Sequence, residues 1–344
     1  MLATRHVIVT ALTLALLAAC GSSPSGVHDG PATRTINVGG VDAAHPERDF
    51  LSFYPATLSV HAGDTLRLSN HSRLPHSVTF GVHPDRSNQP PLIDSGKGYN
   101  AVVGGPCVSA QKVTATTTTC PSAPEGSVPQ AGTPAPEVAL PVPYAGQPFY
   151  NSGIFLGGQT VVLPVAADIK PGAYPFICLL HPTMAATLTV VPPASPTQTA
   201  DDLASTADQR LAVDRTDAST VFTSLPAPSA GVVHAGAVGK EVSLEQFFPT
   251  TASISVGQTV TWKNGSYEPH VVVLGRRLSP EDPLVFGPPT QPPGSAYAGG
   301  VVVSGLFAGR PFPSDHYSLT FTMPGTYTYM CPLHPGMAGV VEVT

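Results

Sequence analysis

The sequence predicts an all-β protein built from two tandem β-sandwich domains, joined by a linker that contains a short helix. Two observations carry this prediction: a long internal repeat, and short stretches in which apolar and polar residues alternate between turn signals. Charged residues make up only 11% of the 344 residues, whereas Gly (33) and Pro (39) are abundant. This composition favours many short strands connected by turns over long helices.

The internal repeat aligns residues 53–76 with residues 247–270 without a gap. The shared residues of this block form the pairs Pro55/Pro249, Gly63/Gly257, Thr65/Thr259, Asn70/Asn264, Pro75/Pro269 and His76/His270. Residues 171–184 match residues 324–337 in the same way, through Pro-Gly, Tyr, Cys, Leu-His-Pro and Met. Two copies of one fold explain both matches.

Each copy also shows the period-two alternation that is typical of a half-buried strand. Thr65-Leu-Arg-Leu-Ser and Thr259-Val-Thr-Trp-Lys both follow closely after a glycine turn. Neither copy contains a strong amphipathic helix, so each is predicted to be an antiparallel β-sandwich.

These patterns divide the chain into five predicted segments. They are an export signal over 1–19, a flexible tether over 20–32, a first domain over 33–191, a linker over 192–237 and a second domain over 238–344. The first domain is the longer one because it carries a predicted loop insertion at about 83–150. Within the linker, residues 200–214 are predicted to form a short helix packed between the domains.

The N-terminus resembles the signal of a bacterial lipoprotein. An apolar run over 7–19 follows Arg5, is too short for a stable transmembrane helix, and ends in Leu-Ala-Ala before Cys20. In such a lipobox the Cys becomes the lipid-modified new N-terminus. We therefore expect the chain to be exported and anchored to the outer face of the bacterial cytoplasmic membrane or cell envelope through lipid on Cys20. An ordinary secretory signal with a chance Cys is the alternative.

Two further cysteines fall in the predicted insertion. Cys107 and Cys120 lie in a stretch rich in Pro, Thr and Ser. In an oxidising compartment outside the cytoplasm we expect them to form a disulfide that pins this loop. Two free thiols are the alternative.

The remaining cysteines mark two candidate metal sites at matching points of the repeat. Each begins a Cys-x-x-His-x-x-Met loop, and each copy has a Pro-His pair upstream. A thiolate, two imidazoles and a weak thioether are the ligands of a type 1, or blue, copper site. Zinc competes for Cys and His, but structural zinc sites favour more thiolates and do not recruit Met. The candidate ligands are His76, Cys178, His181 and Met184 in the first copy, and His270, Cys331, His334 and Met337 in the second.

At these residues the chain resembles the cupredoxins, the small blue copper proteins. The short ligand loop, with Pro after its His, looks most like the amicyanin subgroup. The resemblance covers about 33–191 and 238–344, and it implies Greek-key β-sandwiches that transfer single electrons by Cu(I)/Cu(II) cycling. It also implies that redox partner proteins dock near the solvent-edge ligands, which are His181 and His334 here.

The two sites are not predicted to be equivalent. Many cupredoxins have Asn directly after the first His, whereas this chain has Ser77 in one copy and Val271 in the other. Leu179 keeps a backbone N–H beside the first thiolate, and Pro332 has none beside the second. Donors near a thiolate favour Cu(I), so we expect the first site to have the higher reduction potential.

Full ligand sets in both copies favour an electron carrier with two coppers, rather than an enzyme. An oxidase or nitrite reductase needs further copper ligands such as His-x-His pairs, and the sequence contains none. A copper storage or delivery protein is the alternative, although such proteins usually carry many Met and His ligands and this chain has five Met. The formal charge of −6 and the lack of a basic patch with aromatics give no reason to expect nucleic acid as a partner.

Overall fold

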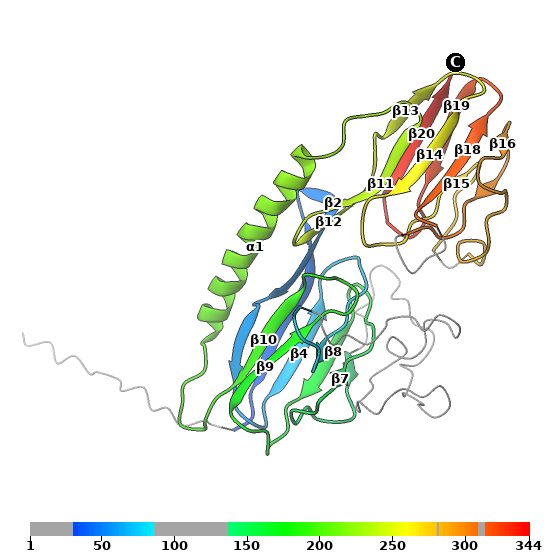
Figure 1. Ribbon diagram of the computed structural model, residues 1–344. Coiled ribbons are helices and arrows are strands. Elements are labelled where there is room, and N and C mark those ends of the chain that lie inside the picture. The colour runs from blue at the N-terminus through cyan, green and yellow to red at the C-terminus, as the bar shows by residue number, and fades with distance from the viewer. Residues whose placement is uncertain (1–29, 86–136, 281, 309–313) are drawn as a thin grey trace, which may run out of the picture.

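The computed structural model describes residues 30–85, 137–280, 282–308 and 314–344, and shows two β-sandwiches with a long helix beside them (Figure 1). The predicted all-β fold class is confirmed. The predicted signal over 1–19 and the cysteines Cys20, Cys107 and Cys120 lie outside the described residues. Within the described ranges, no helix is both long and apolar enough to cross a membrane.

The first half of the chain contributes the strands of one sandwich. They are β1 (Thr33–Asp42), β2 (His45–Tyr54), β3 (Thr57–Val60), β4 (Thr65–Asn70), β5 (Thr79–Phe80), β6 (Glu137–Ala139), β7 (Tyr150–Asn151), β8 (Thr160–Pro164), β9 (Gly172–Ile177) and β10 (Ala185–Val190). The strand β6 falls within the range predicted to be a loop insertion, and β7 begins at its end.

The second half follows the helix α1 (Ala200–Thr223) and contributes the other sandwich. Its strands are β11 (Val232–Val238), β12 (Val242–Phe248), β13 (Thr251–Ile254), β14 (Thr259–Asn264), β15 (Val273–Leu274), β16 (Ala296–Tyr297), β17 (Val302–Val303), β18 (His316–Phe321), β19 (Gly325–Met330) and β20 (Ala338–Val343). The strand β11 begins inside the range predicted to be linker, so the connection between the halves is shorter than the sequence indicated.

The order of strands is the same in the two halves. In the first, β2-β1-β4-β8-β6 pack against β3-β10-β9-β5-β7; in the second, β12-β11-β14-β18-β16 pack against β13-β20-β19-β15-β17. The sheets are mixed rather than purely antiparallel, because β1 runs parallel to β4 and β3 runs parallel to β10. The chain changes sheets between these paired strands, so they are not joined as hairpins.

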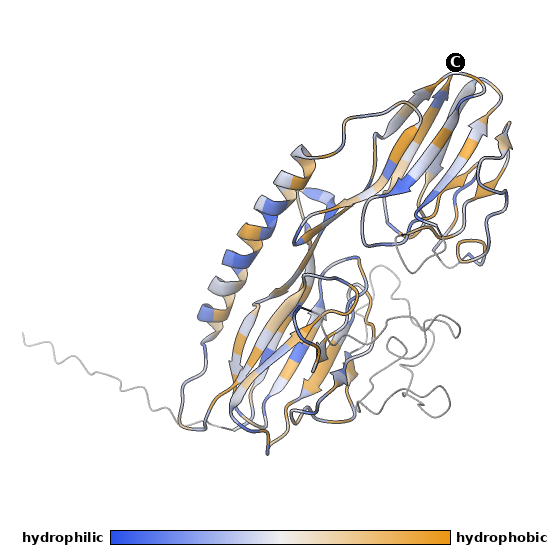
Figure 2. Cartoon of the chain, viewed as in Figure 1, coloured by the Kyte–Doolittle hydropathy of each residue, from blue (hydrophilic) through white to orange (hydrophobic). Residues whose placement is uncertain are grey.

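The two cores are built from equivalent residues. The predicted alternation in β4 places Leu66 and Leu68 inside, and the hydropathy colours of Figure 2 change between hydrophobic and hydrophilic along the strands. Edge-to-face ring pairs lie at the same point of each core, with ring centroids 4.8 Å apart in Phe53–Phe176 and 4.8 Å apart in Phe247–Tyr329. The repeated sequence thus packs in a repeated way.

The two halves share one continuous sheet. The strand β2 pairs antiparallel with β12, with Phe50 opposite Val242 and Asp49 opposite Ser243. This pairing merges one sheet from each half into a ten-stranded sheet. Each half therefore covers the sheet edge of the other, which would otherwise expose unpaired backbone groups.

The helix α1 packs on one face of this junction. Thr199 begins the helix with a capping box, in which its side chain accepts from the backbone of Asp202 and the Asp202 carboxylate accepts from the backbone of Thr199. Buried Ala218 and Val221 pack with Phe50 and other residues of β2 and β12. The helix extends beyond the predicted 200–214 because burial against the junction stabilises its second half.

A buried polar cluster ties the helix to both halves. The hydroxyl of Tyr54, from β2, donates a hydrogen bond to the fully buried Asp214 of the helix. Arg210 forms ion pairs with Asp214 (Nε–Oδ1 3.2 Å) and with Glu241, which precedes β12 (Nη2–Oε2 2.7 Å). Its Nε also donates a hydrogen bond to the Ser52 hydroxyl of β2 (3.0 Å). Burial raises the pKa of Tyr54 and Asp214 adds to that rise, so the hydroxyl keeps the proton that it donates.

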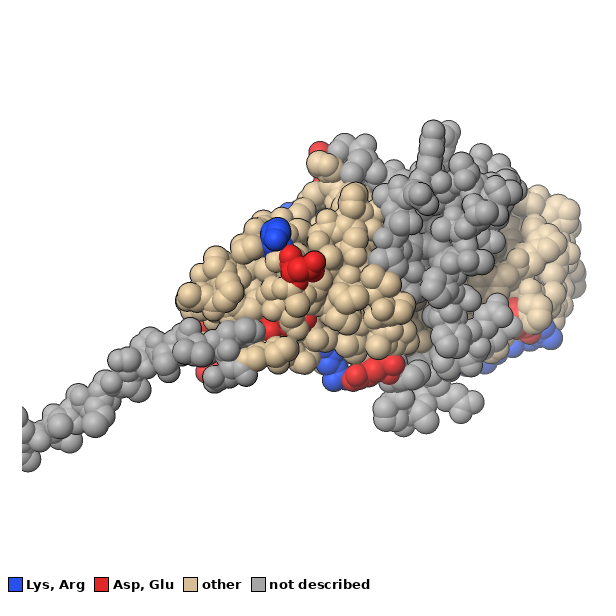
Figure 3. Space-filling view, turned by 90° about the horizontal axis from the view of Figure 1, so that it is seen from below, with Lys and Arg blue, Asp and Glu red and all other residues tan. Residues whose placement is uncertain are grey.

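The described surface of the first half is weakly charged on one side. In Figure 3, only a few Lys, Arg, Asp and Glu side chains appear among the described atoms of that face. This sparse charge agrees with the charged fraction of 11%. A face of this kind provides little long-range electrostatic steering.

The buried cluster predicts that Tyr54→Phe destabilises the protein by about 1–3 kcal/mol, because Asp214 loses a donor inside the structure. Urea unfolding of the metal-free chain measures the change. Tyr267→Phe is the matched control, since Tyr267 is 41% exposed. Equal stabilities of the two variants would contradict the role given to Tyr54.

Candidate metal centres

The first candidate centre is assembled from two separate parts of the first sandwich. His76 follows β4 and is fixed by a two-way backbone bridge with Phe155, at 3.0 and 2.9 Å. Cys178 comes directly after β9, and His181 and Met184 lie on the turn between β9 and β10. All four side chains are buried, with at most 1% of any of them exposed.

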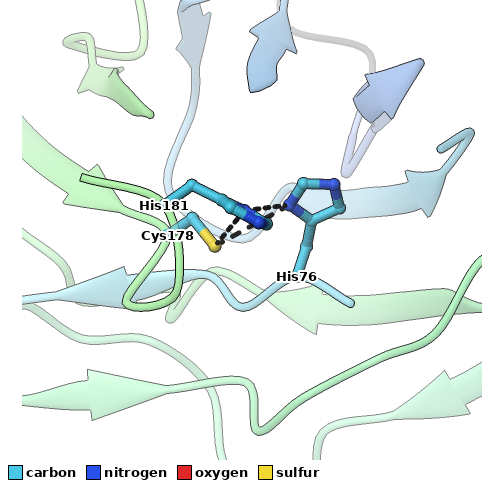
Figure 4. A group of neighbouring side chains, drawn as sticks. All are labelled: His76, Cys178 and His181. Carbon is cyan, nitrogen blue, oxygen red and sulfur yellow. Dashed lines mark hydrogen bonds between the residues drawn. The ribbon is translucent and has the colours of Figure 1, made fainter. Parts of the chain in front are cut away.

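The three nitrogen and sulfur atoms of this centre point toward one another (Figure 4). The Cys178 Sγ lies 3.7 Å from His76 Nδ1 and 3.5 Å from His181 Nδ1, and the two Nδ1 atoms are 3.1 Å apart. Nitrogen and sulfur ligands at about 2.0 and 2.3 Å from a metal ion in trigonal geometry lie about 3.5 Å from one another. The donor set therefore fits one metal ion at its centre.

The second candidate centre repeats this arrangement. His270, Cys331 and His334 bring their ligand atoms within 4.8 Å of one another, and Cys331 Sγ lies 3.4 Å from His334 Nδ1. His270 is held by a two-way bridge with Phe307, the counterpart of the bridge at His76. Its Nδ1 is buried and has no hydrogen-bond partner among the described residues. A metal ion provides what this orphaned atom lacks.

The backbone places each Met on the ligand loop in the same way. In the first loop, the Cys178 N–H donates to the Met184 carbonyl (2.9 Å) and the Met184 N–H donates to the His181 carbonyl (3.2 Å). The second loop has the same two bonds, at 2.9 and 3.0 Å. Three of the four predicted ligands of each site thus come from one closed turn, and the structure brings the upstream His to it from a different strand.

Serine residues hold the two upstream imidazoles. The Ser72 Oγ lies 2.7 Å from His76 Nε2, and the Ser266 Oγ lies 2.9 Å from His270 Nε2. With Nε2 engaged, Nδ1 is left to face the sulfur. Sequence reasoning missed these two serines, although they occupy equivalent positions of the repeat, four residues before each His.

The electrostatics of the first centre favour a thiolate. Burial raises the pKa of Cys178, but the nearby His181 and His76 lower it far more, so that it lies well below its usual range. Burial lowers the pKa of His181, and Cys178 together with Glu268 overcomes this effect and raises it to about 10. Burial lowers the pKa of His76. The thiolate is the form of Cys that binds metals.

The first ligand loop has a brace that the second cannot form. The Leu179 N–H donates to Ser77 Oγ (2.9 Å), and the Ser77 N–H lies 3.4 Å from Cys178 Sγ. Pro332 lacks the donor of this brace and Val271 lacks its acceptor. The difference that the sequence indicated is therefore a difference in how firmly the two loops are held.

The predicted docking of redox partners near His181 and His334 assumed that these two residues lie at the solvent edge. Their side chains are not at the surface, since 0% of His181 and 5% of His334 is exposed. The pairing of β2 with β12 turns the ligand ends of the two sandwiches toward each other, and the Arg73 guanidinium donates to the Pro335 carbonyl (3.3 Å) across the interface. A partner protein cannot touch these imidazole edges directly.

Two buried acids lie next to ligand imidazoles in this interface, and sequence reasoning missed both. The Oε1 of Glu268 is 2.8 Å from His181 Nε2, and the Oε2 of Glu245 is 3.6 Å from His334 Nε2. Burial raises the pKa of Glu245 to about 8, and the charge of Glu268 contributes to the rise. The repeat could have indicated them, because both acids replace a residue that is apolar in the first copy, where Leu51 and Leu74 occupy the equivalent positions.

Known proteins resemble parts of this chain. Residues 234–344 match the family described as copper binding proteins, plastocyanin/azurin family. An amicyanin from Paracoccus versutus is 30% identical over 128 residues, which are 37% of this chain and 79% of that protein. Plastocyanin B'/B'' from Nicotiana tabacum is 33% identical over 100 residues, which are 28% of this chain and 85% of that protein. A chloroplastic plastocyanin from Hordeum vulgare is 31% identical, over only 53% of its length.

Solved structures of amicyanin also align with it. A mutant of amicyanin in the Cu(I) form has 26% sequence identity, and the alignment covers 36% of this chain and 90% of that chain with a TM-score of 0.22.

The brace in the first loop predicts that Ser77→Ala destabilises the metal-free protein by about 1–3 kcal/mol, because the buried Leu179 N–H loses its acceptor. Denaturant unfolding measures the loss. Ser253→Ala, on the exposed side of β13, is the control and should change the stability little. If both serine variants unfold at the same denaturant concentration as the parent, the brace does not stabilise the loop.

Proposed function

Because the chain belongs to the plastocyanin/azurin family of copper-binding proteins, we propose that it is an extracytoplasmic electron-transfer protein with two type 1 copper sites that cycle between Cu(I) and Cu(II). The ligands in this proposal are His76, Cys178, His181 and Met184 for the first site, and His270, Cys331, His334 and Met337 for the second. The observation that carries it is the presence, in each sandwich, of a buried His-Cys-His group whose Cys and second His share one turn with a buried Met.

The burial of these side chains supports electron transfer. At most 5% of any proposed ligand is exposed, and the two imidazole nitrogens and the thiol sulfur of the first site already lie 3.1 to 3.7 Å apart. Copper supplies the one-electron couple when it is bound. The chain keeps the imidazoles and the thiolate in place for both oxidation states, so that little has to move when the electron arrives or leaves.

The same burial speaks against the alternative of copper storage or delivery. A protein that hands its metal to another one needs ligands that a partner can reach, or ligands in mobile tracts. Here the upstream His of each site is fixed by a two-way backbone bridge, and a Ser holds its outer nitrogen. These contacts favour retention of the metal.

The proposal places the protein outside the cytoplasm, with lipid on Cys20 holding it at the membrane surface. The support is the Leu-Ala-Ala-Cys sequence at the end of the apolar run. Redox partner proteins would then dock on other parts of the surface than the buried edges of His181 and His334.

We expect residues 21–344 to bind two coppers and to become intensely blue or green when oxidised, because each Cu–thiolate bond gives a charge-transfer band. Cys178→Ser should remove about half of the absorbance, as one of two thiolates is lost. The double variant Cys178→Ser/Cys331→Ser should remove all of it. Copper titration followed by absorption spectroscopy and metal analysis measures both outcomes.

A parent protein that stays colourless with Cu(II), or that takes up only zinc, would overturn the proposed function. A colour that follows one cysteine alone would reduce the proposal to a single type 1 site.

A further inference from the structure

A residue of the second half contacts a proposed ligand of the first candidate centre. Glu268 lies in the second half, between β14 and His270, and its Oε1 is 2.8 Å from the Nε2 of His181 in the first half. Only 7% of Glu268 and none of His181 is exposed. The contact is therefore a buried hydrogen bond between the two sandwiches, made on the outer nitrogen of a proposed ligand.

The fold of its own loop does not require this carboxylate. The equivalent loop of the first half has Leu74 in this position, buried to 1% exposure, and it presents His76 by the same backbone bridge and the same Ser contact. A buried carboxylate costs free energy unless it is paired. In Glu268 that pairing is made with His181, in the other half of the protein.

The second half also supplies an acidic side chain to its own centre. The Oε2 of Glu245 lies 3.6 Å from His334 Nε2 and 3.8 Å from His270 Nε2, while Oε1 accepts from Ser243 (2.5 Å). The first half has Leu51 at this point of the repeat. Both acids next to the ligand imidazoles thus come from the second half, and Glu268 is the one that crosses to the first.

We propose that Glu268 is a positioning residue of the first copper site, through which the second half of the protein sets the metal affinity and reduction potential of the first. This inference rests on the proposed function. A carboxylate on the outer nitrogen of a ligating imidazole fixes the ring and makes the inner nitrogen a stronger donor. A stronger donor stabilises Cu(II) over Cu(I). The Glu268 contact therefore lowers the potential of the first site, against the effect of the donors near Cys178.

The test uses the full chain with Cys331→Ser, so that the thiolate band reports on the first site alone. In this background, Glu268→Gln keeps the length of the side chain and an acceptor oxygen for His181, but removes the charge. We expect the affinity for Cu(II) to fall about 10-fold and the reduction potential to rise, while the charge-transfer band remains. Titration with Cu(II) against a competing chelator and spectroelectrochemistry measure these two changes.

Glu342→Gln is the matched control, because Glu342 is an exposed carboxylate on β20 of the same half. It should leave the affinity and the potential as they are in the Cys331→Ser parent. If Glu268→Gln also leaves both unchanged, the inference is wrong although the copper sites stand. If the parent binds no copper and shows no colour, the proposed function fails instead.

A measurement without metal tests the same contact when the copper experiments give no signal. In the metal-free chain, the ring nitrogens of His181 can be followed by nitrogen NMR. Glu268→Leu, which introduces the residue of the first copy, should shift the Nε2 resonance of His181 and speed exchange of its proton. Glu342→Gln should not. A His181 ring that is unaffected by Glu268→Leu would overturn the positioning role.

Discussion

The antiparallel pairing of β2 with β12 is the constraint on which the arrangement of the whole molecule depends. Side chains alternate between the faces of a strand, so this one pairing sends Phe50 and Val242 to one face and Asp49 and Ser243 to the other. The apolar face is covered by α1, which packs its buried residues there. The polar face lies where the ligand ends of the two sandwiches meet, so the register of a single strand pair decides what surrounds both candidate centres.

Charged groups and hydrogen bonds link the two halves next to the candidate centres. Asp49, fully buried, accepts from the backbone and the guanidinium of Arg73, and Arg73 in turn donates to the Pro335 carbonyl of the second ligand loop. Glu268 of the second half pairs with His181 of the first half. Such groups are stable inside a protein only when they are paired, so the halves are fixed in a specific orientation. Family members with a single sandwich have no second half to make these contacts.

The repeated scaffold carries different chemistry at equivalent points. The backbone bonds of the ligand loops, the bridges at His76 and His270, and the serines behind them are the same in both halves. The differences lie just outside the ligands, where the first half has Leu51, Leu74, Ser77 and Leu179 and the second has Glu245, Glu268, Val271 and Pro332. Two matching sets of proposed ligands thus have different surroundings, and contacts of this kind around the ligands tune the properties of a metal site.

The sequence by itself determined the class of fold, the tandem repeat and the candidate ligands, because each can be recognised from a local pattern of residues. Alternation predicts strands, the Cys-x-x-His-x-x-Met spacing lies within one turn, and the repeat identifies the upstream His in both copies. Only the tertiary structure decided that β2 pairs with β12, that α1 is extended along the junction, and that Glu268 reaches His181 across 87 residues of sequence. An edge strand has the same alternation whether its neighbour is solvent or another domain, and a carboxylate has no local mark of a distant partner. Those contacts depend on the packing of one half against the other, which no single stretch of the chain encodes.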